Sequence, residues 1–213
     1  MRITRVLPPI SLNTLYVPVV AAVPAFSVAL QARTAADVYL AHESGGNYWT
    51  LKSGSSISFD LEGKPLWNAA EATNLVSNGT FTGAAGEWTF GDAGVHYNSN
   101  NVIKDGAGTL GISQAIPALV QGELYKVIVT MSGYGTSGLN ISIGGGNAGE
   151  TIASDATHTQ YLIAGRTDKV LLFTPVGTAS RWTLDAVELY RMNAPFLIAK
   201  AGGAVTLEII ALV

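Results

Sequence analysis

Two segments, NLVSNGTFTGAAGEWTF at residues 74–90 and SRWTLDAVELY at residues 180–190, begin and end the stretch around which the chain is organised. The first contains the turn-forming pair Asn78-Gly79. It then contains Trp88, which is followed by Thr89 and Phe90, residue types that favour strands. In the second, an imperfect period of two predicts a strand whose buried face carries Trp182, Leu184, Ala186 and Leu189. We expect both tryptophans to be core residues, because large aromatics in patterned strands are mostly buried.

Strands and turns fill the sequence between these two segments. Gln121-Gly122-Glu123 is a turn ahead of an apolar run that predicts a central strand from Leu124. Residues 161–165 and 170–173 are expected to pair as a hairpin. The glycine run at residues 144–147 lacks the Lys-Ser/Thr ending of a phosphate-binding loop, so we interpret it as a connection between strands.

The composition excludes several classes of function. The 213-residue chain carries 12 Lys and Arg against 15 Asp and Glu, with a formal charge of -3, and so lacks the clustered positive charge that nucleic-acid binding requires. The absence of cysteine excludes disulfides, thiolate metal sites and cysteine nucleophiles. A charged fraction of 13% with a mean hydropathy of +0.30 is unusual for a free monomer, and predicts apolar surface buried in an oligomer or assembly.

The apolar run at residues 15–30, preceded by Arg2 and Arg5, imitates a signal peptide. Pro18 and Pro24 interrupt this run, whereas a membrane-crossing helix needs about 20 apolar residues with few breaks. We therefore expect strands here, buried or covered by a partner, and no membrane span. Before them, Pro8-Pro9 predicts an extended segment at a sheet edge, since proline cannot donate to a strand ladder.

Short, regularly spaced strands are expected within residues 33–67, which favours a small β-sandwich or barrel. They are DVYL at residues 37–40, YWTL at residues 48–51 and an alternating segment at residues 57–61. This unit resembles one in tailed-phage virion proteins, where such strands and an aromatic-Thr-Leu-Lys-x-Gly step lead to a Gly-x-x-Leu-Trp return. In those proteins a strand rich in Val, Thr and Leu follows almost at once, whereas here the matching segment is residues 201–211.

The resemblance implies a small β domain, residues 1–73 plus 193–213, that is split by an insertion of residues 74–192. Loop tips tolerate such insertions best. The inserted stretch resembles the carbohydrate-binding-module-like (galactose-binding-like) jelly rolls, through its first and last segments and through QAIPALVQGELYKVIVTMSGY at residues 114–134. We therefore predict an all-β fold, in which a small β-sandwich or barrel domain is split by an inserted jelly-roll β-sandwich.

These resemblances imply a non-enzymatic structural protein of a tailed-phage-like virion, a capsid decoration or head-spike protein. It would fold in the host cytoplasm and reside in the virion. The split domain would bind the major capsid protein and form a homo-oligomer such as a trimer, through apolar surfaces around residues 17–30 and 204–213. The alternative is a carbohydrate-binding adhesin, at a tail-fibre tip or in a free lectin-like module, that recognises a host-surface glycan.

A hydrolase is the third alternative and has the least support. A glycosidase would need two carboxylates across a cleft, and sequence cannot pair the scattered acidic residues. GTSG at residues 135–138 is too short for a serine nucleophile elbow. His42, His96 and His158 each stand alone, so we interpret them as solvated or locally hydrogen-bonded rather than as metal ligands or catalytic bases. The scattered acidic residues are Glu87, Asp92, Asp155, Asp168, Asp185 and Glu188.

Aromatic faces with amide and hydroxyl groups are the side chains from which sugar sites are built. One stretch combines these groups, and Tyr134 adds an aromatic ring from a separate glycine-rich loop. Because loops carry function more often than cores, we predict a glycan loop here; the alternative is that Tyr97 only decorates the loop. The stretch consists of His96, Tyr97, Asn98, Asn100 and Asn101.

A structural calcium ion is the one cofactor that the jelly-roll resemblance implies. Jelly rolls of this type often hold it near the opening Asn-Gly pair and with an Asp of the last strand, which Asp185 matches. Thr82 stands where an acidic residue is usual, and calcium prefers several oxygen ligands including carboxylates. The alternative is that Asp185 is an ordinary strand residue.

Overall fold

The computed structural model describes residues 4–14, 17–19, 27–33, 36–41, 44, 48–60, 73–192 and 198–212. Regular structure in this part of the chain is entirely β-strand, so the predicted all-β class is confirmed. No helix long and apolar enough to cross a membrane occurs among these residues.

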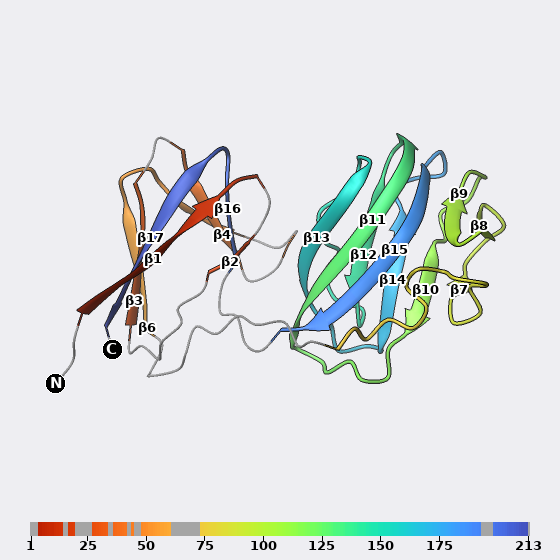
Figure 1. The fold of residues 1–213 in the computed structure, drawn as a ribbon, viewed down its shortest axis with the longest axis horizontal. Helices are drawn as coiled ribbons and strands as arrows, with labels where there is room; N and C mark the ends of the chain where they lie inside the picture. The colour runs from red at the N-terminus through yellow and green to blue at the C-terminus, as the bar shows by residue number, and fades with distance from the viewer. Residues whose placement is uncertain are drawn as a thin grey trace. The chain divides into compact units, whose positions relative to one another are not determined.

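The chain divides into two compact units (Figure 1). Unit 1 comprises Met1–Ala69 with Met192–Val213, and unit 2 is Ala70–Arg191. The boundaries expected from the sequence, 73/74 and 192/193, lie close to these limits. Unit 1 therefore contains both ends of the chain, and unit 2 lies between them in sequence.

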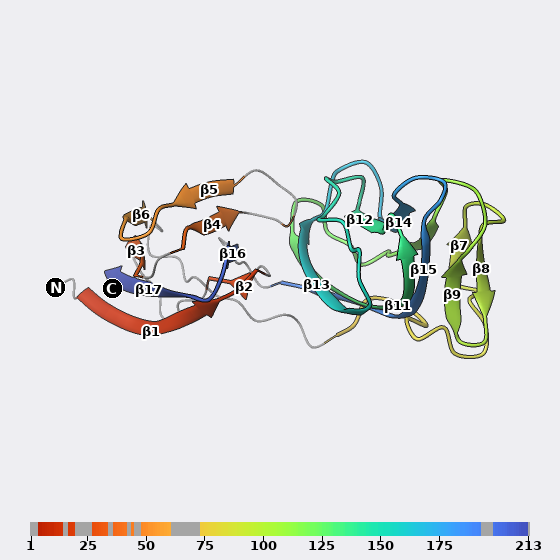
Figure 2. The same ribbon diagram turned by 90° about the horizontal axis from the view of Figure 1, so that it is seen from above.

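Unit 1 is built from two four-stranded antiparallel sheets, with the orders β1-β17-β3-β6 and β2-β16-β4-β5 (Figure 2). Alternate side chains of both sheets are buried in a single hydrophobic core, among them Leu30 and Leu207 from the first sheet and Leu40 from the second. The unit is thus a β-sandwich. Its strands are β1 (Thr4–Leu12), β2 (Val17–Pro18), β3 (Ser27–Ala32), β4 (Val38–Ala41), β5 (Tyr48–Leu51), β6 (Ser56–Asp60), β16 (Ile198–Ala201) and β17 (Val205–Leu212).

The last two strands of the chain occupy interior positions in unit 1. β17 lies between β1 and β3, and β16 lies between β2 and β4. A bend at residues 202–204 joins them, so one short hairpin-like segment supplies an inner strand to each sheet. The predicted final strand is confirmed as β17, which bonds to both neighbours in the first sheet, while β16 does the same in the second.

Strand β1 confirms the expected edge position of the double proline. β1 pairs only with β17, and its register shifts between Leu7 and Ile10, at the site of Pro8-Pro9. Prolines are tolerated there because a bulge on an edge strand leaves backbone groups outside the ladder.

Unit 2 is a second antiparallel sandwich, with sheets β12-β14-β10-β7 and β13-β11-β15-β9-β8. Its core includes Trp88 and Trp182, which are 5% and 1% exposed, so the predicted burial of both tryptophans is confirmed. Trp88 packs between Phe81 and Phe173, with ring centroids 5.3 and 5.9 Å away. The strands are β7 (Thr89–Phe90), β8 (Val95–Asn98), β9 (Asn101–Lys104), β10 (Ile112–Ala115), β11 (Leu124–Thr136), β12 (Leu139–Ile143), β13 (Ala156–Ile163), β14 (Val170–Pro175) and β15 (Arg181–Arg191).

The hairpin predicted from residues 161–165 and 170–173 is wrong. β13 pairs with β11, whereas β14 pairs with β10 and β12 in the other sheet. The backbone N–H of Ala164 still bonds to Glu123, but that of Gly165 bonds to Ile143 of the opposite sheet. The chain therefore passes from one sheet to the other at this point. The two apolar runs expected to pair belong to different sheets. The glycine run at residues 144–147 does connect strands, β12 to β13, as predicted.

A bulge explains the imperfect alternation of the closing strand. The register of β15 against β11 passes from Leu184↔Met131 to Ala186↔Thr130, so Asp185 is an extra residue. After the bulge the inward positions are Val187 and Leu189, and the predicted burial of Ala186 is wrong. The extra residue shifts the side-chain period by one position.

We expect Leu207→Ala to destabilise unit 1 by about 2–5 kcal/mol, because Leu207 is fully buried on the inner strand β17. Hydrogen exchange resolved by segment should reveal faster exchange in β1, β3 and β17, while β11 and β15 of unit 2 keep their protection. Val6→Ala is the control, since Val6 is 71% exposed. Equal loss of protection in unit 2 would contradict two separate cores.

Candidate functional site

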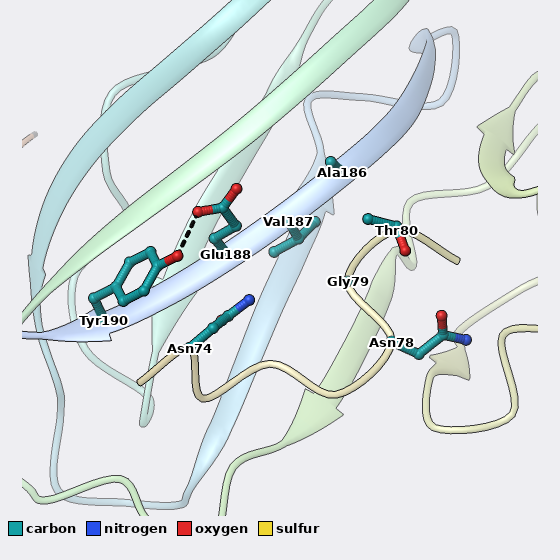
Figure 3. Close-up of a pocket in the computed structure, with 8 residues that line it drawn as sticks. All are labelled: Asn74, Asn78, Gly79, Thr80, Ala186, Val187, Glu188 and Tyr190. Atoms are coloured by element: carbon teal, nitrogen blue, oxygen red, sulfur yellow. Dashed lines mark hydrogen bonds between the residues drawn. The ribbon is translucent and has the colours of Figure 1, made fainter. Parts of the chain in front are cut away.

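An open pocket of about 390 Å³ lies on unit 2, between the chain's first residues in that unit and strand β15 (Figure 3). We call it the β15 pocket. Small residues leave space in it, and polar side chains surround that space. It is lined by Asn74, Asn78, Gly79, Thr80, Ala186, Val187, Glu188 and Tyr190.

The pocket exists because two different segments cover one edge of β15. β9 pairs with β15 only from Trp182 to Leu184. Beyond that point residues 74–80, here called the edge segment, take over. The N–H of Leu75 donates to the carbonyl of Leu189 at 2.8 Å, and the N–H of Val187 donates to the carbonyl of Gly79 at 2.8 Å. These bonds satisfy backbone groups of β15 that would otherwise be unpaired.

Asn74 fastens the edge segment to the end of β15. Its Oδ1 accepts hydrogen bonds from the backbone N–H groups of Val76 and Leu189, each at 3.0 Å. The first and last parts of unit 2 are therefore tied together by one side chain.

Gly79 allows the edge segment to lie directly on β15. A Cβ at this position would be only 2.0 Å from the carbonyl oxygen of Val187 and 3.1 Å from Cγ1 of Val76. Only glycine permits this approach without displacing the backbone. The preceding Asn78 has φ of 47°, a left-handed conformation that asparagine tolerates, and the predicted Asn-Gly turn is confirmed.

Glu188 and Tyr190 form the polar wall on the β15 side. They alternate with buried Val187 and Leu189, so they project from the outer face of the sheet. The Tyr190 hydroxyl donates to Oε2 of Glu188 at 2.7 Å (Figure 3). This hydrogen bond raises the pKa of Tyr190 above its ordinary value, because the bond favours the protonated phenol.

The pocket contains hydrogen-bonding groups that the described part of the protein does not use. Among the described residues, Oε1 of Glu188 and Nδ2 of Asn74 have no hydrogen-bond partner. They offer an acceptor and a donor respectively. In the same part of the chain, no three His, Asp or Glu side chains gather so as to hold a metal ion.

The predicted glycan residues His96 to Asn101 lie in the β8–β9 hairpin, away from the β15 pocket's lining. Ser99 and Asn100, with φ of 49° and 72°, form its two-residue turn. The Tyr97 hydroxyl and the N–H of Gly83 both donate to Oδ1 of Asn100, at 3.3 and 2.9 Å. The turn's amide oxygen is thus occupied within the protein.

The other members of the predicted site differ in their surroundings. Nδ1 of His96 lies 3.6 Å from Oδ1 of Asp105, and the exposed side chain of Asn98 makes no hydrogen bond within the described residues. Tyr134 belongs to strand β11 rather than to a loop, because a bulge around the flanking glycines lets the strand continue to Thr136. Strands β15 and β9 lie between β11 and β8, so Tyr134 is not part of the hairpin.

Asp185, the expected calcium ligand, lies at the bulge of β15 and accepts a hydrogen bond from Nδ2 of Asn101 at 3.4 Å. Thr82 is hydrogen-bonded to Thr80 through their hydroxyls at 2.9 Å. A calcium ion at Asp185 stays a prediction. Of the histidines, His158 is locally hydrogen-bonded to Ser154 at 2.9 Å, as expected, and His42 lies outside the described residues.

The β15 pocket was not anticipated from sequence. From sequence, Glu188 is one of several scattered carboxylates, and Asn74 is the start of an expected strand. The period of two places Glu188 and Tyr190 on an outward face, which is a usable signal. Their proximity to Asn74, more than 100 positions earlier, comes from the pairing of the edge segment with β15.

Comparison with known proteins adds no relative: no protein-family model matches the chain, and no curated protein matches it significantly. Function must therefore be inferred from the residues and their geometry.

We expect Asn74→Ala to lower the stability of unit 2 by about 1–3 kcal/mol, because two backbone N–H groups lose their acceptor at about 0.5–1.5 kcal/mol each. Thermal unfolding would measure the change. Asn98→Ala, which removes an exposed amide of the hairpin, serves as the control and should leave the transition within about 0.5 kcal/mol. If Asn74→Ala unfolds at the same temperature as the wild-type chain, Asn74 does not stabilise the contact between the edge segment and β15.

We also expect Glu188→Ala to lower the pKa of Tyr190 toward the ordinary tyrosine value of about 10. The hydrogen bond requires a protonated phenol, so it contributes below that value and is lost as pH rises through the raised pKa of the folded protein. Phenolate absorbance during alkaline titration would measure the shift, with Tyr190→Phe identifying the signal of this residue. An unchanged titration would rule out the Glu188 bond as the cause.

Proposed function

We propose that the chain is a non-enzymatic structural protein of a tailed-phage-like virion, a capsid decoration or head-spike protein that attaches through unit 1 and displays unit 2. The observation that carries the proposal is that the chain forms two compact units, each with its own core. Unit 1 is closed by both ends of the chain, and the two ends of unit 2 are held together by Asn74 and Leu189. Such a unit can project without interrupting the sandwich that carries it.

Exposed apolar side chains on edge strands support attachment through unit 1. On β1, Val6 is 71% exposed; on β5, Tyr48 and Trp49 are 56% and 46% exposed. Trp49 pairs with buried Leu40 and faces the core side, but its position on the edge strand leaves it at the rim. Exposed aromatic residues on a sheet edge mark a contact surface, since a free edge invites further pairing.

The partner in this proposal is the major capsid protein, and copies of the chain form a homo-oligomer such as a trimer on the particle. The apolar residues expected to make this contact, around residues 17–30 and 204–213, include Val28, Leu30, Leu207 and Ile209, which are instead buried in the core of unit 1 itself. In this proposal, burial of the Tyr48–Trp49 edge supplies the apolar contact, with affinity arising from area removed from water. The protein would fold in the host cytoplasm and act in the virion.

A second candidate function is carbohydrate binding by unit 2, as the adhesin of a tail fibre or other surface structure. The β15 pocket favours it, because the pocket combines an aromatic ring with a carboxylate and an amide that the protein does not use fully. Both functions are compatible in one virion protein, since they use different units.

Attachment is tested by co-sedimentation with capsids that lack this protein. We expect a chain with residues 74–190 replaced by a short Gly-Ser linker to sediment with the capsids like the full chain. Loss of attachment on this deletion, with unit 1 still folded by circular dichroism, would overturn the proposal.

Trp49→Glu, in the full chain, should weaken capsid binding by about 2 kcal/mol or more, about thirtyfold, as expected for an aromatic anchor of an interface. Leu172→Glu is the matched control, because Leu172 is 38% exposed on β14 of unit 2. An equal effect of the two substitutions would argue against the β5 edge as the contact.

A further inference from the structure

The outer face of the five-stranded sheet in unit 2 carries hydrogen-bonding capacity that the fold leaves unused. In the β15 pocket, Glu188 gives one carboxylate oxygen to Tyr190, and Asn74 gives its amide oxygen to two backbone donors. The second carboxylate oxygen and the amide nitrogen have no partner within the described residues. In the β8–β9 hairpin, by contrast, Oδ1 of Asn100 is already occupied.

We propose that the β15 pocket binds a vicinal diol of a sugar, with Glu188 accepting from the hydroxyl groups, Asn74 donating to one of them and the Tyr190 ring flanking the pyranose. This inference deepens the second proposed function, carbohydrate binding by unit 2, and rests on it. It assigns the sugar site to the β15 pocket instead of the β8–β9 hairpin that the sequence predicts.

The chemistry of the lining groups selects this class of ligand. An ionised carboxylate accepts hydrogen bonds only, whereas an amide nitrogen donates only. Neighbouring hydroxyl groups of a sugar can do both, so one diol can satisfy Glu188 and Asn74 together. Bonds to a charged acceptor are the stronger kind, which makes Glu188 the main determinant of affinity. The pocket's 390 Å³ lies in the range of about 300–1,000 Å³ typical of small-molecule sites.

The same groups are held in place before any ligand arrives. Asn74 is fixed by its bonds to Val76 and Leu189, and Glu188 is fixed by Tyr190. Gly79 and Ala186 leave space beside them, because neither carries a side chain larger than a methyl group. Preorganisation of this kind reduces the ordering cost of binding.

The surface next to the pocket extends the site along the sheet. Lys126 of β11 is in register with Tyr190 of β15 on one side and with Tyr161 of β13 on the other. Side chains in register share a face, so Lys126 lies beside Tyr190, one strand away from the pocket, while Tyr161 on its other side is buried. A sugar chain longer than one residue could continue there, and an anionic sugar would gain from the lysine charge. The test therefore includes neutral and anionic glycans.

The experiment is a glycan array of neutral and sialylated or uronic-acid glycans probed with the full chain, followed by calorimetric titration of the best neutral and anionic binders. We expect binding by the wild-type chain. Glu188→Gln should weaken it about tenfold or more, which corresponds to the loss of a bond to a charged group. Ala186→Trp should abolish it by filling the pocket. Glu123→Gln, a carboxylate outside the pocket lining, should leave it unchanged.

Each outcome decides between the pocket and the broader proposal, provided that melting curves report a folded protein. If the wild-type chain binds but only Asn98→Ala in the hairpin weakens binding, the pocket assignment is overturned while sugar binding by unit 2 stands. If the wild-type chain binds no glycan, sugar binding and the pocket assignment both fail. Capsid attachment through unit 1 is measured separately and is unaffected by either result.

Discussion

Unit 1 depends on one constraint, which is that one inner strand of each of its sheets comes from the C-terminal part of the chain. Ile209 of β17 is in register with Leu7 of β1 on one side and with Leu30 of β3 on the other. Without β17, both neighbours would have a row of backbone groups with no partner, and a sandwich cannot bury such unpaired groups without a large cost in free energy. β16 has the same position in the second sheet. Whatever lies between β6 and β16 must therefore return the chain to this unit.

Unit 2 returns the chain to unit 1 because its first and last segments lie side by side and are hydrogen-bonded to each other. The edge segment continues the hydrogen bonding of β15 where β9 stops, and Asn74 secures it near the end of β15. The β15 pocket is a consequence of this irregular pairing. A regular strand would cover β15 along its length, whereas the edge segment, with Gly79 pressed against Val187, leaves the side chains of Glu188 and Tyr190 beside open space. Fold closure and the candidate binding site thus share the same residues.

The two candidate sugar surfaces differ in how far the protein satisfies its own polar groups. In the β8–β9 hairpin, the composition of His, Tyr and Asn favours a ligand site, yet Tyr97, Asn100 and Asn101 bond to residues of unit 2 itself, and the exposed side chain of Asn98 is not held in place by any hydrogen bond to the described residues. In the β15 pocket the residue types are less suggestive, but donor and acceptor capacity is left over. A site is defined by unsatisfied, prearranged groups rather than by composition, which is why geometry favours the pocket.

The sequence by itself determined the all-β class, the buried tryptophans, the edge role of Pro8-Pro9 and the strand near the C-terminus, because these depend on local periodicity and on proline's missing N–H. Only the tertiary structure decided three things: that β13 and β14 lie in opposite sheets, that Asp185 is the extra residue of a bulge, and that Asn74, Glu188 and Tyr190 line one pocket. The physical reason is that strand pairing is non-local. An apolar run predicts that a strand will be buried, but it does not predict which strand it will pair with. A bulge, or an edge segment that replaces a strand, arises only when two distant segments align.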